Sequence, residues 1–547
     1  MISADGILKR FQQLESRRGE WEGIWQMCSD YVLPRSGAQG KTNRKIWDDT
    51  AGLALGRFAA AMESVLVPRT HKWHSLAVGI PELDQRPEAA AWLEEVRDGL
   101  FLARYAPEAN FANQFTEALL SLGVHGTAVM FIDDDLGRGL RYKCIPLHEV
   151  YLAEDAVGRV DTVFRRYSLT ARQAAGQFGD RLPENILAEA EDQARMDREH
   201  EFLHAVFPRR NAPAGLAGPE NLPVASVHIA VQARALVRVS GYRALPYAVS
   251  RFNVTAGDVY GRSPAMEVMP SIIQLNEMTK TILRAAEKMV DPPILVPDGD
   301  VITAFNLRPG AVNFGGLDYD GRPRMVPFQI NGNLPVGLEM IEDRRRVINE
   351  AFFINLFQVL VERPGDQTAT EVIERATEKA QLLAPVMGRQ QSELLWPIIN
   401  RELDILSTAG ALPPAPESLR RAGVPVNPKY ETDMAQALGS QDARAILNAF
   451  ASLATLAQAD ESVLKMVDIR QAGRRLWVSS GASARVLRSE EEMEQMDAEA
   501  RAAQEQAALM QEAGALAQGL ATVSAAEKNL AQAGRARGNS SEVTGNA

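Results

Sequence analysis

The chain has 547 residues, 46% of them hydrophobic and 24% charged, a globular composition long enough for two to four folding units. The net charge of −11, from 59 basic and 70 acidic residues, argues against a tight duplex-DNA binder, which needs a basic surface to release counterions. It is compatible with a protein past which DNA slides. The charged N-terminus is unlike a signal peptide, and no apolar run reaches about 18 residues, so we expect a soluble intracellular protein without a membrane span.

Two helices are predicted near the N-terminus. Between Ile7 and Cys28, apolar residues recur at spacings of three and four, which is typical of an amphipathic helix. A polar break over 34–43 follows. The second helix begins near Asp48 or Asp49, either of which is a suitable N-terminal cap, and its many small residues favour close packing.

From His125 the hydrophobic period shortens toward two, which indicates strands. A short helix is predicted at 170–178. The expected fold class is α+β, mainly α, with the α/β part before about residue 260. The expected strands cover 127–132, 140–145, 159–167, 202–207 and 226–239.

The middle of the chain predicts a helical hairpin with a decorated tip. One helix opens at Ser263-Pro264, with serine as cap and proline in the first turn, and ends near Val290. A second runs from Pro335 to about Phe352, and the proline- and glycine-rich stretch between them, 291–334, indicates a small strand-and-turn insert. The first helix has an apolar stripe of Val268, Ile272, Leu275, Ile282, Ala286 and Met289, and a polar stripe of Gln274, Glu277, Thr281, Arg284 and Lys288.

The C-terminal third is predicted to be helical. Thr368 to Glu371 form a capping box, which starts a long helix reaching about Thr408. Pro385 and Pro397 should kink this helix, because each removes a backbone hydrogen bond. Further helices are expected over 431–535, followed by a disordered tail at 536–547.

The sharpest enzymatic signal is His200-Glu201-Phe202-Leu203-His204, which fits the H-E-x-x-H pattern of zinc hydrolases. That chemistry requires a helix, so that both histidines reach one ion. Here Phe202 to Phe207 are typical of a strand, which would separate the histidines by about 13 Å. We therefore expect no catalytic residues, no metal site and no cofactor, and keep a zinc-dependent hydrolase as the alternative.

Arg344, Arg345 and Arg346 form a basic run on the second hairpin helix. Successive helical residues step about 100°, so the three guanidinium groups spread around the helix. Glu342 and Glu350, each four residues from Arg346, favour salt bridges. The alternative is a basic collar that touches passing phosphate groups without holding them.

Three segments in the same order resemble the portal, or head-to-tail connecting, proteins of short-tailed bacteriophages. The first is Asp49-Thr50-Ala51 with the small-residue helix behind it. The second is Asp258-Val259-Tyr260-Gly261-Arg262-Ser263-Pro264, and the third is Thr368-Ala369-Thr370-Glu371-Val372. The resemblance extends over roughly residues 20–480.

The resemblance implies a dodecameric portal ring built from several regions. These are the α/β wing (1–262), stem helix 1 (263–290), the small β-containing clip (291–334), stem helix 2 (335–352), the tunnel loop (353–367), the long kinked wing helix and link (368–430), the helical crown (431–535) and the tail (536–547).

The resemblance to this family implies a non-enzymatic protein that forms the channel for double-stranded DNA during packaging and ejection. The expected location is the capsid portal vertex of the virion, and the host cytoplasm during assembly. Implied partners are further copies of the chain, the terminase packaging motor, tail adaptor and tail proteins, and major capsid, scaffold or internal core proteins. Candidate channel residues are the polar stripe and the three arginines. Candidate tunnel-loop residues are Phe353, Asn355, Leu356, Phe357, Gln358, Glu362 and Arg363, and candidate clip docking residues are Arg308, Asp318, Arg322 and Arg324.

Twelve copies would carry about −130 charges, a field that discourages DNA from sticking to the wall. A different ring or scaffold component of the virion is the other alternative. Ring size and position would separate it from a portal.

Overall fold

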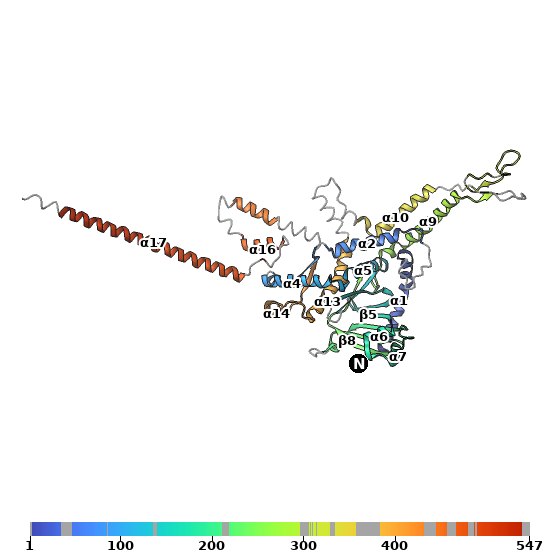
Figure 1. Ribbon diagram of the computed structural model, residues 1–547, viewed down its shortest axis with the longest axis horizontal. Coiled ribbons are helices and arrows are strands. Elements are labelled where there is room, and N and C mark those ends of the chain that lie inside the picture. Colours follow the sequence, from blue (N-terminus) through green and yellow to red (C-terminus); the bar gives the residue numbers. More distant parts are fainter. Residues whose placement is uncertain are drawn as a thin grey trace, which may run out of the picture. The chain divides into compact units, whose positions relative to one another are not determined.

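Figure 1 shows the computed structural model. It describes residues 3–33, 46–69, 71–84, 86–134, 139–209, 218–295, 306, 308, 310–312, 314–328, 334–356, 383–430, 445–456, 467–479, 486 and 490–538. The chain divides into two compact units, which are described separately. The first comprises Met1–Leu76, Glu95–Pro414 and Val426–Ala437, and the second Ala77–Glu94, Ala415–Pro425 and Leu438–Ala547.

Helix α1 (Ala4–Val32) confirms the predicted amphipathic N-terminal helix. The Ser3 hydroxyl caps it by accepting a hydrogen bond from the Gly6 N–H at 3.2 Å. One side of α1 lies on a β-sheet, where the Phe11 ring meets Tyr151 edge-on with 4.7 Å between ring centroids. The buried residues of α1 are Ile7, Phe11, Leu14, Arg18, Trp25, Cys28 and Val32.

The two larger sheets of the first unit are antiparallel. The five-stranded sheet follows chain order: β4 (Val150–Glu154), β5 (Val160–Thr170), β6 (Glu199–Pro208), β7 (Val224–Ala230) and β8 (Ala235–Tyr242). The three-stranded sheet has the order β3 (Leu140–Cys144), β2 (Thr127–Asp134) and β9 (Tyr247–Arg251).

The five-stranded sheet is covered on both faces. Leu203 of β6 lies in the core with α1, whereas its neighbour Phe202 packs with α6 (Ala171–Phe178) and α7 (Glu184–Glu191). Successive strand residues point to opposite faces, so this pair of neighbours shows two buried faces. A sheet buried on both faces is a rigid platform for what is attached to it.

The strand predictions are largely confirmed, with one error. The single strand expected over 226–239 is two strands, β7 and β8, joined by a turn at 231–234 in which Arg234 has a φ of 47°. No glycine or proline marks that turn, so the hydrophobic pattern runs through it. Four strands were not predicted: β1 (His74–Ala77), β4, β9 and β12 (Asn427–Tyr430).

A helical layer connects the sheets to the hairpin. It contains α2 (Thr50–Leu66), α5 (Phe111–His125) and α8 (Pro264–Glu267). Gly123 of α5 permits close packing with α2, since a Cβ there would lie 2.6 Å from the Leu55 Cδ1. The small residues of α2 and α5 therefore bring these two helices together.

The predicted hairpin is present as α9 (Met269–Val290) and α10 (Leu334–Ala351), which lie side by side and extend away from the sheets (Figure 1). Between them, Ile294–Leu295 (β10) pairs antiparallel with Val326–Pro327 (β11), as expected for a small β-containing insert. The fold class, α+β and mainly α, is confirmed.

The helix predicted to run to Thr408 is described from residue 383. It has a π-helical turn at Gln391–Leu395, directly before α13 (Trp396–Thr408). Pro397 has no N–H to give to residue 393, so the wider turn falls where an α-helical bond is impossible. Glu393 on this turn accepts hydrogen bonds from the Arg251 backbone N–H and guanidinium, at 2.9 Å each.

The remaining elements are short or belong to the second unit. Strand β1 (His74–Ala77) pairs with β12 (Asn427–Tyr430), and α4 covers Pro87–Arg104. The second unit includes α3 (Pro81–Asp84), α14 (Glu417–Ala422), a helix at 445–456, α16 (Ile469–Ser479) and α17 (Glu490–Gly538). Helix α17 extends slightly past residue 535, where the tail was expected to begin.

None of the helices in the described part of the chain combines the length and apolar character needed to cross a bilayer.

Candidate functional site

The two stripes predicted for the first hairpin helix lie on different sides of α9. Ile272 and Leu275 are buried, and Ile282 contacts Gly337 of α10, whereas Met289 near the tip is 49% exposed, so the apolar stripe is covered at its root but not at its end. The polar stripe is exposed to solvent at every position: Gln274, Glu277, Thr281, Arg284 and Lys288. A helix with this division can pack on one side and line a water-filled space on the other.

The segment Asp258 to Pro264 anchors the base of the hairpin. Gly261 is required there, because a Cβ would lie 2.2 Å from the Gly126 carbonyl oxygen. The Ser263 hydroxyl accepts a hydrogen bond from Met266 N–H at 3.0 Å and donates one to the Val124 carbonyl at 2.7 Å. This segment therefore fixes the start of the hairpin to the end of α5.

Asp48 joins both hairpin helices at their root. Its carboxylate accepts a hydrogen bond from the Arg345 guanidinium of α10 at 2.7 Å and one from the Thr50 N–H at 2.9 Å. Beside it, Trp47 N–H donates to the buried Asn276 side chain of α9 at 2.7 Å. The Asp48 side chain is only 2% exposed.

Burial alone would raise the pKa of Asp48, but the hydrogen bonds from Thr50 and Arg345 outweigh it and lower that pKa. The carboxylate is therefore ionised and holds the hairpin as a charged clamp. The sequence marked Asp48 only as a possible helix cap. No local signal could have revealed the pairing with Arg345, because the two residues are 297 positions apart.

The three consecutive arginines all have acidic partners in the chain. Arg345 binds Asp48 and also Glu342, the latter at 2.8 Å. Asp343 lies between Arg344, at 2.8 Å, and Arg346. Arg346 thus pairs with Asp343 and not with Glu342 or Glu350. Its side chain is the most exposed of the three, at 67%, against 38% for Arg345 and 34% for Arg344.

The insert presents charged side chains around one tight turn. Asp318 organises that turn, because its carboxylate accepts hydrogen bonds from the Asp320 and Arg322 N–H groups at 2.9 and 2.8 Å. Arg308, Arg322 and Arg324 are exposed, while Asp318 is half-buried. The three arginines are therefore accessible to a partner, and the aspartate is used within its own loop.

Helix α10 ends where the tunnel loop was expected to begin. Phe353 has a φ of 58°, in the left-handed region, which interrupts the helix. Its ring packs near Phe252 with 6.1 Å between centroids. A single helical turn follows at 354–356, containing Asn355 and Leu356. The other loop candidates lie outside the described residues: Phe357, Gln358, Glu362 and Arg363.

The H-E-x-x-H segment lies on strand β6, which separates its histidines along the strand. His200 Nε2 lies 2.7 Å from a Glu189 oxygen, and both ring nitrogens of His204 contact hydroxyl groups, of Tyr247 and Ser226. The His204 ring stacks on His228 with 4.0 Å between centroids.

Burial lowers the pKa of the His228 imidazole to about 3 and that of His204 in the same direction, so both stay neutral. Among the residues that the structure describes, no group of three or more metal-binding side chains gathers. This geometry gives the zinc-hydrolase alternative no support.

Comparison with known proteins places the chain among phage proteins. It is 29% identical over 534 residues to the portal protein of Salmonella phage epsilon15, covering 95% of both chains. It is 30% identical over 443 residues to the probable portal protein of Bordetella phage BPP-1, covering 79% of both.

Two solved structures of gene transfer agent particles show weaker similarity. For a chain of the native virion the TM-score is 0.36 at 12% identity, covering 79% of this chain and 91% of that one. For a chain of the neck of an empty particle it is 0.38 at 13% identity, covering 83% and 93%. Scores this low add nothing to the assignment. The family model described as bacteriophage head to tail connecting protein matches residues 4–487, and this chain therefore belongs to that family.

Proposed function

We propose that this chain is the subunit of a portal ring, through which double-stranded DNA enters the capsid during packaging and leaves it during ejection. The observation that carries the proposal is the family match over residues 4–487. The similarity to the portal protein of phage epsilon15 over 95% of both chains supports it. A dodecameric ring is the assembly that we propose.

The hairpin is proposed as the stem that lines the channel. Exposure of the whole polar stripe of α9 supports this role, because a DNA channel is filled with water and ions. The net charge of −11 per subunit is compatible with this role, since a negatively charged ring as a whole does not hold phosphate groups tightly. In this arrangement 1–262 form the wing, 291–334 the clip, 353–367 the tunnel loop, 368–430 the wing helix and link, and 431–535 the crown.

The proposed partners follow from the position of a connector between head and tail. The exposed Arg308, Arg322 and Arg324 suit docking of the terminase motor and tail adaptor at the clip. Capsid, scaffold or internal core proteins would contact the rest of the ring. The proposed location is the capsid vertex of the virion, with assembly in the host cytoplasm.

We also propose that the chain performs no catalysis of its own. The family is a structural one, and the best enzymatic motif is placed on a strand with its histidines hydrogen-bonded elsewhere. The energy for moving DNA would come from the motor that docks on the ring.

Electron microscopy of the purified full-length protein tests the ring. We expect closed rings with a central channel and twelvefold symmetry, located at one vertex in virions. Monomers or dimers alone under assembly conditions would contradict the proposal, and rings at another position would favour a different virion component. Stoichiometric zinc, with a hydrolytic activity lost in His204→Ala, would favour the enzyme.

A further inference from the structure

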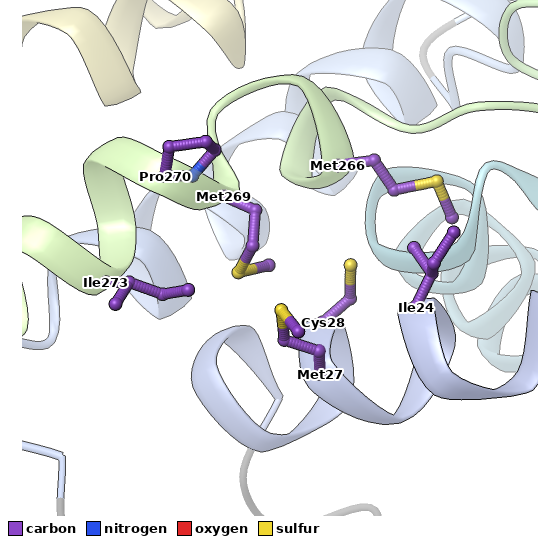
Figure 2. Close-up of a pocket in the computed structure, with 7 residues that line it drawn as sticks. All are labelled: Ile24, Met27, Cys28, Met266, Met269, Pro270 and Ile273. Carbon is purple, nitrogen blue, oxygen red and sulfur yellow. The ribbon is translucent and has the colours of Figure 1, made fainter.

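An apolar groove lies where α1 meets the start of the hairpin. It has a volume of about 420 Å³ and is lined by Ile24, Met27, Cys28, Met266, Met269, Pro270 and Ile273. Figure 2 shows the α1 side chains on one side and those of α8 and α9 on the other, turned toward the same space. Ile24 and Met27 on its rim are 41% and 38% exposed. Apolar side chains open to water in this way are typical of a contact surface.

The groove lies on the side of α9 that faces away from α10. Ile282 contacts Gly337 of α10, and the buried Leu275, seven residues earlier, lies on the same face of α9. Ile273 precedes Leu275 by two residues, which places it about 200° around the helix. Seven residues after Ile273, Lys280 occupies the same outer face. The groove therefore continues toward the tip as a charged surface.

A complementary ridge lies on a flank of α10. Val336, Met340, Val347 and Ala351 follow one another at spacings of four, seven and four, which is the spacing of a ridge on a helix surface. Val336 is 48% and Met340 50% exposed, while Ile341 and Ile348, on the face toward α9, are buried. The flank is thus apolar, with Val336 and Met340 open to water and Val347 and Ala351 half-buried.

The groove and the ridge lie at matching heights along the hairpin. Ile282 contacts Gly337 near the tip, and at the root Asp48 accepts hydrogen bonds from Arg345 of α10 at 2.7 Å and from the Thr279 hydroxyl of α9 at 3.5 Å. In this antiparallel pair, Ile273 is therefore level with Val347. By the same register Lys280 is level with Met340.

The charges beside the two surfaces are also complementary. Arg284 of α9 and Glu339 of α10 are both exposed, and neither makes an ion pair within the part of the chain that the structure describes. In the register above they differ in height by less than one helical turn, within reach of two long side chains. Arg284 follows Ile273 by eleven residues, which places it about 20° from the groove face, at the edge of the polar stripe. It can therefore reach Glu339 of another molecule.

We infer that the groove of one copy receives the α10 ridge of the next copy. A closed ring needs two different, complementary faces on each subunit, and these two surfaces meet that requirement. The segment that follows α1 is a poorer occupant, since 34–45 read PRSGAQGKTNRK and offer no large apolar side chain. This inference rests on the proposed ring and adds the identity of one subunit contact.

Cross-linking tests the contact in the full-length protein. Cys28→Ala and Cys144→Ala remove the native thiols, and Ile273→Cys and Val347→Cys are then introduced together. A short bismaleimide should join neighbouring copies and give a ladder of covalent multimers well beyond the dimer. A ladder requires two different faces on each copy, whereas a symmetric contact stops at the dimer. Each single cysteine variant should give no ladder.

The matched control is Ile273→Cys with Leu338→Cys. Leu338 is 53% exposed and lies on the same helix, but on the other flank. This variant should give no ladder. Rings visible by microscopy without cross-linking of 273 to 347 would overturn the inference and leave the ring itself intact. Absence of rings from the unmodified protein would instead contradict the proposed function.

A charge exchange covers the case in which the cysteine variants do not assemble. Arg284→Glu alone should lower the yield of rings several-fold, and Arg284→Glu with Glu339→Arg should restore it. Circular dichroism and thermal unfolding would show that both proteins are folded. Two outcomes with folded proteins would overturn the inference. In one, Arg284→Glu forms as many rings as the unmodified protein. In the other, Arg284→Glu loses rings and the double variant does not recover them.

Discussion

Ionic groups serve different purposes in the sheet-and-helix body and in the hairpin. In the body, the Arg104 guanidinium binds Glu402 at 2.5 Å with both side chains 0% exposed, and Tyr142 donates to the same carboxylate at 2.5 Å. On the hairpin, the ion pairs of Arg344 and Arg346 with Asp343 are open to solvent. Buried pairs hold distant segments in one arrangement, while exposed pairs remain available to partners.

The buried pair joins segments that are remote in sequence. Arg104 ends α4, Tyr142 lies on β3, and Glu402 lies on α13. The nearby aromatic rings of Trp73 and Phe101 cover the guanidinium at 4.6 and 4.9 Å. Removing the charge of either Arg104 or Glu402 would leave the other charge buried without a partner. We therefore expect substitutions at this buried pair to cost more stability than substitutions of the exposed charges on the hairpin.

The largest effect is expected at the buried pair. Glu402→Ala should lower the free energy of unfolding by about 3–5 kcal/mol, because it leaves the Arg104 charge buried and unpaired. Chemical denaturation would measure the loss. Glu417→Ala is the control, since the pair of Glu417 with Arg421 is exposed and should contribute less than about 1 kcal/mol. Equal losses of unfolding free energy in Glu402→Ala and Glu417→Ala would show that the buried pair is no more important for stability than the exposed one.

A smaller effect is expected at the Asp48 clamp. Asp48→Asn should cost about 1–2 kcal/mol at neutral pH, because Arg345 is 38% exposed and its charged hydrogen bond is partly screened. Arg345→Gln should cost a similar amount, and the double variant should cost little more than either one. Additive losses would show that the two residues are not coupled.

The same pair should show a pH dependence of defined sign. The pKa of Asp48 is lower in the folded protein than in the unfolded chain, so its contribution is present above the ordinary carboxyl pKa of about 3.9. That contribution is lost as the pH falls through the folded value. The stability difference between the wild type and Asp48→Asn should therefore shrink below about pH 4. If the stability difference stays constant below pH 4, the Asp48 carboxylate does not stabilise the fold through its charge.

The smallest effect on stability is expected for Arg344 and Arg346, whose pairs with Asp343 are local to helix α10. Arg344→Gln with Arg346→Gln should change the unfolding free energy by less than about 0.5 kcal/mol and leave rings intact. If these side chains touch passing DNA, virions built with the variant should hold less packaged DNA. Arg345→Gln is the matched control and should mainly reduce stability. Loss of rings in the double variant would instead assign the arginines to subunit contacts.

The hairpin was the best predicted part, because its signals are local. Helical periodicity places Leu275 and Glu277 on different faces of the helix, and Pro292-Pro293 mark its end. Neither signal requires tertiary information. Strands β4 and β9 were missed because both are short and largely buried, so no polar alternation marks them. The predicted channel stripe and clip arginines remain predictions until DNA and partners are tested.

The sequence by itself determined the positions of the N-terminal and hairpin helices, the α+β fold class and the resemblance to phage connectors. These depend on patterns of residues that are close together in the sequence. Only the tertiary structure decided which charges are structural. It assigned Arg345 to Asp48, Arg104 to Glu402, and Arg251 to Glu393. Ion pairing and register depend on atoms brought together from distant positions, and no local pattern records them.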